Sequence, residues 1–413
     1  MNIKELALKA KKASKTLMTI GTKKKNEALG SICSALFENA EIILAENQKD
    51  IEKAKQKGTS PAMIDRLTLT KERISSMAEG VKKIIDLEDP IGETVGAKTL
   101  PNGLKVSKVT VPMGLIGVIY ESRPNVTLDT AALCLKASSA VILRGGSDAF
   151  NSNKAIVTVM KDAVEKVGID PDCISFVEDT SRETATELMK LNGIVDLLIP
   201  RGGASLIQSV VQNATIPVIE TGVGNCHIFI DESADGDMAA EIVANAKASR
   251  PSVCNACESL VIHKNADDSV YKKIYAALKE KNVEIRGCGE TAKRINCDAP
   301  ATSEDFDTEY LDYIISIKTV DSIDEAIEHI SKYSTGHSEC IVTNNLNNAV
   351  RFTNEIDSAA VYVNASTRFT DGFEFGLGAE IGISTQKLHA RGPMGLKEIT
   401  TTKYIILGSG QIR

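Results

Sequence analysis

The hydrophobic positions of residues 1–90 recur at helical spacing. Ile3, Leu6, Ala10, Ala13 and Leu17 form one such stripe near the start of the chain. Charged segments rich in Ala and Leu follow at residues 23–39, 49–57 and 71–87, with breaks at residues 58–61 and at Pro90. No alternating pattern typical of a strand interrupts them. We therefore predict that this region is helical throughout.

The period changes from helical to alternating near Glu93. Two strand-like runs, residues 94–99 and 104–111, flank the turn signal Pro101-Asn102-Gly103, which predicts a β-hairpin. Residues 400–407 form one more run of β-forming residues close to the end of the chain. A terminal strand with no following partner has a free edge, so we expect it to pair with the hairpin of another subunit.

Short apolar runs alternate with helical segments over most of the remaining chain. The first series has strands at residues 115–120, 140–144, 173–177, 195–199 and 218–220, with helices at 127–138 and 152–167. A second series follows Cys226, with strands at 227–230, 259–263, 313–317 and 339–343 and helices at 238–248, 269–281 and 322–332. Such alternation predicts an α/β fold with two right-handed, doubly wound parallel sheets.

Composition narrows the class of protein. The 413 residues include 48 Lys and Arg against 55 Asp and Glu, a net charge of −7, which argues against an electrostatic nucleic-acid binder. No run approaches the ~20 apolar residues of a membrane-spanning helix, so we expect no membrane partner. Nine dispersed cysteines without a secretory signal predict a reducing, cytoplasmic location. One CxxC pair and scattered histidines predict no metal site.

Cys254 lies in a loop between two predicted elements, and loops of this kind are where α/β proteins place reactive groups. It follows the helix expected to end near Ser249 and precedes an apolar strand. A thiolate in such a loop can attack a carbonyl carbon and form a thiohemiacetal or a thioester. Two alternatives stay open from the residues alone: Cys254 as a small buried hydrophobe, and Cys254 with Cys257 as a dithiol redox pair.

Glycine-rich turns follow several of the predicted strands. They are Arg144-Gly145-Gly146-Ser147, Arg201-Gly202-Gly203-Ala204 and Gly222-Val223-Gly224. The first two lead toward helix N-termini, where main-chain amides and the helix dipole favour a phosphate group. Arg144 offers an additional contact to a ribose 2′-phosphate. The usual dinucleotide and nucleoside-triphosphate fingerprints are absent, and ordinary turn chemistry also explains each glycine pair.

Six runs of residues carry a family resemblance. Residues 112–125 (PMGLIGVIYESRPN), 140–147 (AVILRGGS) and 250–256 (RPSVCNA) resemble the aldehyde dehydrogenase superfamily. Residues 120–127 (YESRPNVT), 331–339 (SKYSTGHSE) and 389–396 (HARGPMGL) are similar to its gamma-glutamyl phosphate reductase branch, also called glutamate-5-semialdehyde dehydrogenases. The resemblance covers essentially the whole chain.

The resemblance implies a domain organisation and an activity. Residues 1–92 and 112–224 would form a Rossmann-like cofactor domain, 225–392 a smaller catalytic domain, and 93–111 with 393–413 an oligomerisation arm. The implied reaction is the second step of proline biosynthesis, in which NADPH reduces L-glutamyl 5-phosphate to L-glutamate 5-semialdehyde and phosphate is released. Cys254 would be the nucleophile that carries a thioester. Asn125 would stabilise the oxyanion together with the main-chain N–H of Cys254; from the residues alone Asn125 is also explained as a turn residue.

The same resemblance assigns the binding residues. Arg144, Gly145, Gly146 and Ser147 would approach the adenosine ribose and its 2′-phosphate. The pyrophosphate would lie at Gly202 and Gly203, and the nicotinamide ribose at Glu309, which is otherwise a solvated acid beside a strand. Charge alone suggests that Arg123 and His337 bind the leaving phosphate or the substrate carboxylates, although His337 is equally explained as a structural histidine.

Glu220 and the partners complete the expectations. Glu220 stands where hydrolytic members of the superfamily carry a base, but hydrolysis would waste the acyl group, which leaves it a positioning role. A homo-oligomer, dimer or tetramer, is implied by analogy, and glutamate 5-kinase is a candidate partner that supplies the acyl phosphate. Two rival functions remain: a semialdehyde dehydrogenase using coenzyme A or water instead of phosphate, and an inert scaffold of the same fold.

Overall fold

The computed structural model describes residues 2–121 and 123–413, and the chain divides into two compact units. Unit one contains the chain up to Thr221 together with Gly376–Gly382 and Met394–Arg413. Unit two contains Gly222–Phe375 and Ile383–Pro393. The division near residue 221 lies close to the expected boundary at residue 224. The segments expected to form a separate arm belong to unit one, apart from Pro393, and residues 376–382 belong to unit one as well.

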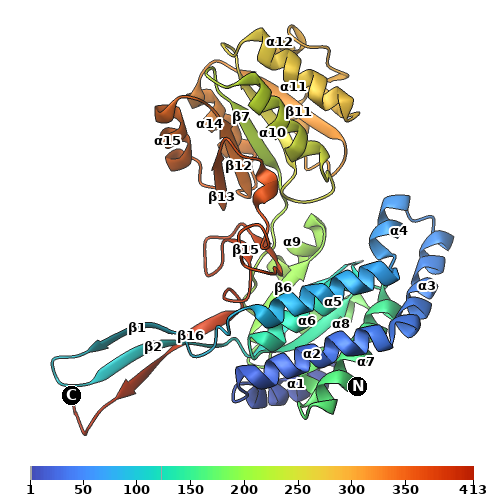
Figure 1. Ribbon diagram of the computed structural model, residues 1–413, viewed down its shortest axis with the longest axis vertical. Coiled ribbons are helices and arrows are strands. Elements are labelled where there is room, and N and C mark those ends of the chain that lie inside the picture. Colours follow the sequence, from blue (N-terminus) through green and yellow to red (C-terminus); the bar gives the residue numbers. More distant parts are fainter. Residues whose placement is uncertain (1, 122) are drawn as a thin grey trace. The chain divides into compact units, whose positions relative to one another are not determined.

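Unit one begins with five helices, and the prediction of a helical region is confirmed. They are α1 (Ile3–Leu17), α2 (Thr22–Glu38), α3 (Ala40–Gln56), α4 (Pro61–Leu67) and α5 (Lys71–Asp86). The apolar stripe of α1 is buried at Ala7, Ala10, Ala13 and Leu17, which is the face that packs on the rest of the unit. Figure 1 shows these helices in blue; α1 lies against the sheet of unit one, whereas α2, α3 and α5 pack on helices that connect its strands.

The sheet of unit one is parallel and has the order β5-β4-β3-β6. Its strands are β3 (Leu115–Tyr120), β4 (Ala140–Gly145), β5 (Ile174–Phe176) and β6 (Leu197–Arg201), and the connecting helices are α6 (Pro124–Lys136), α7 (Phe150–Lys166), η1 (Pro171–Cys173), α8 (Arg182–Met189) and α9 (Ala204–Asn213). Tyr120 lies opposite both Gly145 and Arg201. The carboxyl ends of three strands therefore meet at one edge of the sheet.

The strand expected at residues 218–220 is wrong. This segment contributes one isolated bridge, between Val218 and Leu198. Leu198 donates its N–H to Pro217 O and accepts a bond from Ile219 N, both at 2.9 Å. The apolar pattern at 218–220 therefore reflects one bridged contact with β6 rather than a strand.

A second, antiparallel sheet projects from unit one as a ribbon (Figure 1). The predicted hairpin is confirmed as β1 (Thr94–Thr99) and β2 (Lys105–Pro112), and the last strand is β16 (Thr400–Leu407). The expectation that β16 pairs with another subunit is wrong, because it pairs with β2 of its own chain from Thr400 opposite Pro112 to Leu407 opposite Lys105. Since β1 covers only one edge of β2, the returning chain completes the other edge.

Unit two is built on a seven-stranded parallel sheet of order β10-β9-β11-β8-β7-β12-β13. The strands are β7 (Cys226–Ile230), β8 (Cys257–His263), β9 (Glu284–Gly287), β10 (Ala299–Pro300), β11 (Ile314–Val320), β12 (Ser338–Val342) and β13 (Ala360–Val363). The helices are α10 (Gly236–Ala248), α11 (Asp268–Glu280), α12 (Gly289–Ala292), α13 (Ser303–Phe306), α14 (Ile323–Tyr333), α15 (Leu346–Glu355) and η2 (Thr367–Phe369). Two short strands, β14 (Gly382–Ser384) and β15 (Gly392–Met394), pair with each other.

Helices cover both faces of the unit two sheet. Ile228 and Ile230 of β7 pack in the hydrophobic cluster that includes α10 and α11, whereas Phe229 between them packs in the cluster of α14 and α15. Because successive side chains of a strand point to opposite faces, this alternation requires the sheet to be buried on both sides. The predicted α/β architecture is confirmed in both units.

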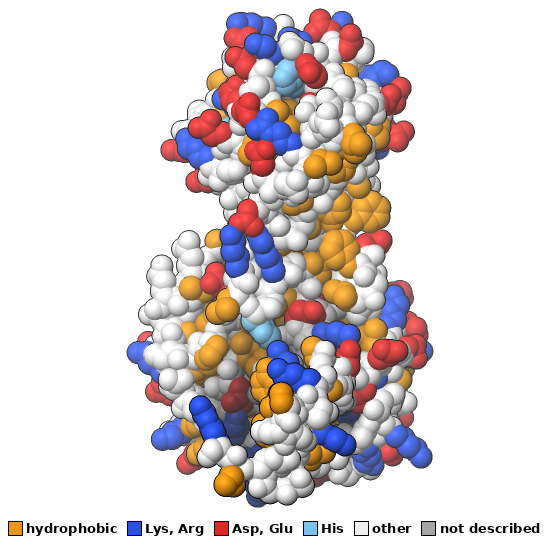
Figure 2. Space-filling view, turned by 90° about the vertical axis from the view of Figure 1, so that its left-hand side faces the viewer, with side chains coloured by type: hydrophobic (Ala, Val, Ile, Leu, Met, Phe, Trp, Pro, Cys, Tyr) orange, Lys and Arg blue, Asp and Glu red, His pale blue; other side chains and the backbone are white. Residues whose placement is uncertain are grey.

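Two surface properties bear on function. In the described part of the chain no single helix is long and apolar enough to cross a membrane; α2 and α3, bent by 69° at their junction, meet the length and composition test only as a pair. On the face drawn in Figure 2, basic and acidic side chains are interspersed rather than segregated by sign. That face therefore carries no extended basic field of the kind that binds nucleic acid.

Candidate active site

Cys254 lies in a turn between α10 and β8 of unit two. Val253 and Ala256 close this turn, because the N–H of Ala256 donates to Val253 O at 3.1 Å. The Cys254 side chain is partly exposed, whereas six of the other eight cysteines are buried. The position predicted from the sequence, a loop between a helix and an apolar strand, is confirmed.

The main chain of Cys254 packs directly against a glycine and a second cysteine. A Cβ added to Gly224 would lie 1.5 Å from Cys254 O, so no other residue fits there without displacing the turn. The buried Cys226 donates its S–H to the same carbonyl oxygen at 3.1 Å, and burial raises the pKa of this thiol well above its usual value. Cys226 is therefore a protonated donor that holds the backbone of Cys254.

Glu309 lies beside the same segment. Its Oε1 accepts the N–H of Gly224 at 2.7 Å, which ties the carboxylate to the residue that packs on Cys254. Burial raises the pKa of Glu309, while the Gly224 N–H and the charge of Lys247 act in the opposite direction. Glu309 is thus a largely enclosed acid near Cys254, and not the freely solvated acid considered as the alternative.

Asn255 anchors the other side of the turn. Its Nδ2 donates to Thr370 O at 2.9 Å and to Arg368 O at 3.3 Å, and its main-chain oxygen accepts the hydroxyl of Thr367 at 2.7 Å. The Arg368 guanidinium contacts Asn255 Oδ1 through Nη1 and donates from Nε to Ser249 Oγ at 3.1 Å. Every polar atom of the Asn255 side chain is engaged, so the residue after Cys254 is fixed.

His337 belongs to the buried support of this turn rather than to its surface. The ring is fully buried, and its Nδ1 lies 2.8 Å from Ser338 Oγ and 3.7 Å from Cys226 Sγ. Burial lowers the pKa of His337 to about 4, so the ring is neutral near pH 7. A neutral, enclosed imidazole supplies no charge to an anion, and the structure therefore corrects the expectation that His337 binds phosphate directly.

The other half of the CxxC pair has no redox character in this structure. Cys257 is the first residue of β8, is fully buried and lies with its Sγ 3.4 Å from Ser259 O. Burial raises the pKa of its thiol far above the usual value. Such a thiol is a packed neighbour in the sheet, which argues against a dithiol pair with Cys254.

In unit one the predicted site residues gather at the carboxyl edge of the sheet. Asn125 follows β3 as the second residue of α6, is exposed, and donates from Nδ2 to Asp129 Oδ2 at 3.3 Å. Burial raises the pKa of Asp129 to about 6, while the Asn125 amide and the charge of Arg201 lower it. Arg123, the N-cap of α6, is exposed at the same edge; Ser122 of this run lies outside the described residues.

The turn after β4 presents part of the expected surface. Ser147 is exposed and Gly146 partly so, whereas Gly145 is buried, and a Cβ there would lie 2.4 Å from Asn153 Nδ2. The Arg144 Nη2 donates to Thr180 O at 2.6 Å and to Ser181 O at 3.0 Å. One nitrogen of the Arg144 guanidinium therefore holds the loop before α8. This is the same guanidinium that was expected to contact a 2′-phosphate.

The turn after β6 already holds a carboxylate. Gly203 is the N-cap of α9, and its N–H donates to Glu121 Oε2 at 3.0 Å. A Cβ on Gly202 would lie 2.4 Å from that same oxygen. The predicted anion position at Gly202 and Gly203 is therefore occupied by a negatively charged group of the chain itself, as the dipole of α9 favours.

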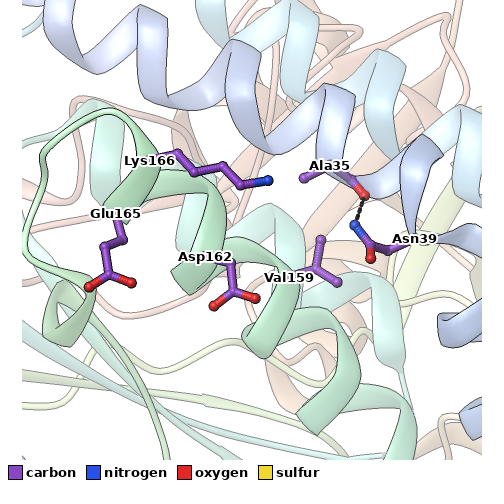
Figure 3. Close-up of a pocket in the computed structure, with 6 residues that line it drawn as sticks. All are labelled: Ala35, Asn39, Val159, Asp162, Glu165 and Lys166. Carbon is purple, nitrogen blue, oxygen red and sulfur yellow. Dashed lines mark hydrogen bonds between the residues drawn. The ribbon is translucent and has the colours of Figure 1, made fainter.

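The cavity described next contains none of the predicted site residues. A cavity of about 370 Å³ between α2 and α7 is lined by Ala35, Asn39, Val159, Asp162, Glu165 and Lys166 (Figure 3). The Asn39 side-chain amide donates a hydrogen bond to Ala35 O at 2.8 Å. No predicted site residue lines this cavity. Among residues 2–121 and 123–413, no group of His, Cys, Asp and Glu side chains is arranged to hold a metal ion.

The fold and the cysteine turn together define the class of protein. The model of the aldehyde dehydrogenase family matches residues 1–288 and 295–405, and the chain belongs to that family. It is accordingly an oxidoreductase with the family's α/β fold, as the sequence predicted. An acetylating aldehyde dehydrogenase from Geobacillus thermoglucosidasius, 18% identical over 100% of this chain and 97% of its own, shares the fold with a TM-score of 0.72.

Closer relatives narrow the resemblance to one branch. The chain is 59% identical over 408 residues to a gamma-glutamyl phosphate reductase of Carboxydothermus hydrogenoformans, covering 99% of this chain and 98% of the relative. The crystal structure of a gamma-glutamyl phosphate reductase from Thermotoga maritima matches with a TM-score of 0.97 at 49% identity, and each chain is covered completely. The resemblance to this branch is thereby confirmed.

Sequence reasoning missed four residues of the site. Asn255 and Arg368 fix the cysteine turn, Gly224 packs on it, and Glu121 fills the anion position in unit one. Gly224 and Glu121 stood in motifs noted in the sequence, but nothing in their spacing signalled these contacts. Arg368 lies far along the chain from Cys254, so only the fold brings it to the turn.

Proposed function

We propose that the protein is an NADPH-dependent gamma-glutamyl phosphate reductase that converts L-glutamyl 5-phosphate to L-glutamate 5-semialdehyde and phosphate. The observation that carries the proposal is the partly exposed Cys254, held by its main chain in a rigid turn, in a chain 59% identical to a relative of that name. A fixed and accessible thiol is what an acyl-transfer nucleophile requires.

The chemistry proceeds at the sulfur of Cys254. The thiolate attacks the acyl carbon of the substrate, a C–S bond forms, and the C–O bond to phosphate breaks to leave a thioester. The tetrahedral species carries an oxyanion, for which we assign the main-chain N–H of Cys254 and the Asn125 amide as donors; losing one such donor typically costs ~100–1000-fold in rate. Cys226, Gly224 and Asn255 keep the turn in place throughout.

The nicotinamide cofactor supplies the hydride that reduces the thioester to the aldehyde. The start of α9 fits an anionic group, because the N–H of Gly203 binds the Glu121 carboxylate there at 3.0 Å, and a pyrophosphate would take the place of that carboxylate. We assign the pyrophosphate to this turn, the adenosine ribose and 2′-phosphate to Arg144 and the Gly145 to Ser147 turn, and the nicotinamide ribose to Glu309. Glu220 retains a positioning role in this proposal.

The decisive experiment follows NADP⁺ reduction with glutamate 5-semialdehyde in buffers with and without inorganic phosphate. We expect phosphate-dependent reduction by the wild type and a loss of about 10³-fold or more in Cys254→Ser. Cys297→Ser, which changes another partly exposed cysteine, is the matched control and should retain activity.

Each contrary result points to a rival. Activity without phosphate would identify a hydrolytic dehydrogenase and restore Glu220 as its base. A requirement for coenzyme A in place of phosphate would identify an acylating enzyme. A folded protein without activity, unaffected by Cys254→Ser in any assay, would favour the inert scaffold.

The ribbon of β1, β2 and β16 supports a proposed homo-oligomer. Tyr404, Ile406 and Leu407 of β16 are exposed by 64, 57 and 64%, an apolar edge that a second copy would cover. We expect a dimer or tetramer by light scattering, and dissociation by Ile406→Asp with Lys403→Asp as the control on the same strand. A monomeric wild type would contradict this proposal.

Two further expectations, a cytoplasmic location and transfer of the substrate from glutamate 5-kinase, stay predictions.

A further inference from the structure

A buried ion pair closes the base of the loop that carries Cys254. Lys247 lies in the last turn of α10, and Glu258 is the second residue of β8, so the two residues flank the cysteine turn along the chain. Lys247 Nζ lies 2.5 Å from Glu258 Oε2, and both side chains are completely buried. The ion pair therefore ties the end of the helix to the start of the strand on either side of Cys254.

Both members of this ion pair also contact the segment that carries Glu309. Glu258 Oε1 accepts the N–H of Leu311 at 3.3 Å. Lys247 Nζ lies 5.9 Å from the centre of the Tyr310 ring. Since Tyr310 and Leu311 directly follow Glu309, the ion pair joins the base of the cysteine loop to the segment that presents the Glu309 carboxylate.

Leu311 has a backbone conformation that requires support. Its φ is +55°, in the left-handed region that leucine rarely adopts. Its side chain is 39% exposed, so burial of that side chain does not explain the conformation. Such a residue persists where its surroundings fix it, and the hydrogen bond from its N–H to Glu258 is one contact that does so.

The contacts return to the cysteine turn through Glu309. The Glu309 Oε1 accepts the N–H of Gly224 at 2.7 Å, and Gly224 packs directly on Cys254 O. The contacts therefore form a closed circuit that begins and ends on the cysteine loop. Apolar side chains of similar size often stabilise an interior as well as a buried ion pair does, so packing alone does not account for two charges here.

We propose that Lys247 and Glu258 are positioning residues that fix the spacing between the Cys254 thiol and the Glu309 carboxylate. The inference rests on the proposed function, in which Glu309 binds the nicotinamide ribose and the hydride is delivered to the carbon bonded to Cys254. Neither side chain is exposed, so both act through the residues they hold. A misplacement near 1 Å costs such a reaction about 100-fold in rate.

The principal test removes both charges together. Lys247→Met combined with Glu258→Leu leaves no unpaired charge in the interior, so this double variant should fold, whereas either substitution alone strands a buried charge and lowers the unfolding temperature. We expect the double variant to lose at least tenfold in kcat for NADP⁺ reduction and to bind NADPH about tenfold more weakly. A merely structural ion pair predicts instead that the kinetics recover together with the stability.

A second double variant separates the two contacts of Glu258. With Lys247→Met and Glu258→Gln, the new amide oxygen can still accept the Leu311 N–H. Its affinity for NADPH, measured by fluorescence titration, should return to within about threefold of wild type. Equal affinities of the two double variants would overturn the role of the bond from Leu311 to Glu258.

The control for lost stability is Leu278→Ala. Leu278 is buried on α11 in the hydrophobic cluster on one face of the sheet, so its truncation should lower the unfolding temperature. Its kcat and NADPH affinity should stay within twofold of wild type at temperatures where circular dichroism shows folded protein. An equal loss of kcat in this control would assign the effect to stability and overturn the inference.

Two further outcomes separate the inference from the proposed function. Wild-type kinetics and NADPH affinity in the folded Lys247→Met, Glu258→Leu variant would overturn the inference while leaving the proposed function intact. A wild type that binds NADPH but shows no phosphate-dependent reduction of NADP⁺ would refute the proposed function. The NADPH titrations would then still decide whether the ion pair positions Glu309, because they do not depend on turnover.

Discussion

The cysteine turn of unit two and the sheet edge of unit one are built in opposite ways. Around Cys254 the supporting groups are buried side chains, including Asn255, Thr367 and His337, each bonded to a named partner. At the edge of unit one the groups proposed to bind a ligand are exposed side chains, such as Ser147, and the main chain of glycine turns, such as that of Gly203. A nucleophile needs one fixed atom, whereas a ligand bound by backbone amides can adjust its position.

The largest effect that would sharpen this contrast comes from Gly224→Ala. Its methyl group would lie within 1.5 Å of Cys254 O, and buried neighbours leave the turn no room to yield without moving the sulfur. We expect kcat to fall by about 100-fold, since a displacement near 1 Å has that cost. Gly289→Ala, where nothing lies within 4 Å of the added methyl, is the matched control. A kcat within threefold of wild type would show that the turn is softer than its contacts indicate.

A smaller effect is expected from Gly202→Ala at the unit one edge. Here the added methyl meets Glu121 Oε2 at 2.4 Å, the far end of a flexible side chain that can swing away. We expect the KM for NADP⁺ to rise about tenfold with kcat nearly unchanged, and NADPH fluorescence titration to report the same loss of affinity. Gly30→Ala in α2, with open space around it, is the control. A fall in kcat without a change in affinity would contradict the assignment of this turn to the pyrophosphate.

The smallest effect concerns the stability of unit one. Because the pKa of Asp129 is raised to about 6 in the folded state, the folded chain holds its proton up to a higher pH than the unfolded chain does. The free energy of unfolding therefore decreases as pH rises from about 4 to 6 and stays lower above that. Asp129→Asn has no such loss and should be more stable at pH 8, by about 1 kcal/mol.

Calorimetric scans at pH 5 and pH 8 check this prediction. The unfolding temperature of Asp129→Asn should exceed that of wild type by a few degrees at pH 8, with a smaller difference at pH 5. Asp162→Asn on the exposed face of α7 should follow the wild type at both pH values. A difference that did not depend on pH would show that the fold does not raise the pKa of Asp129.

The sequence predicted the parts of the fold that depend on local pattern. Sequence patterns correctly predicted the apolar stripe of α1, the turn at Pro101-Asn102-Gly103 and the apolar run of β8, because periodicity and turn chemistry depend on only a few neighbouring residues. Residues 218–220 failed because a three-residue apolar run carries no periodicity. The order of helix and strand predicted that Cys254 lies in a loop, whereas its role as the nucleophile was implied by the family resemblance and stays a prediction.

What surrounds Cys254 could not be predicted in the same way. Arg368 and Asn255 are 113 residues apart in the chain, and their contact exists only once the sheet has brought η2 to the turn. The burial of His337 likewise depends on both neighbours of β12, so its neutral state could not be deduced from a motif that contains a histidine. Whether a side chain carries a charge depends on how far the fold exposes it to water, and the spacing of residues in the sequence does not show that exposure.

The pairing of β16 with β2 also constrains how the polypeptide forms during synthesis. Unit two is encoded between two parts of unit one, and the Gln411 side chain bonds to Asn102 O across 309 residues. The edge of β2 that pairs with β16 therefore stays uncovered until the whole of unit two has been translated. Contacts of such long sequence separation form slowly, and an open strand edge invites association with other chains in the meantime. Unit two can complete its sheet first, so the second edge of β2, one of the first strands to be synthesised, is among the last to be covered.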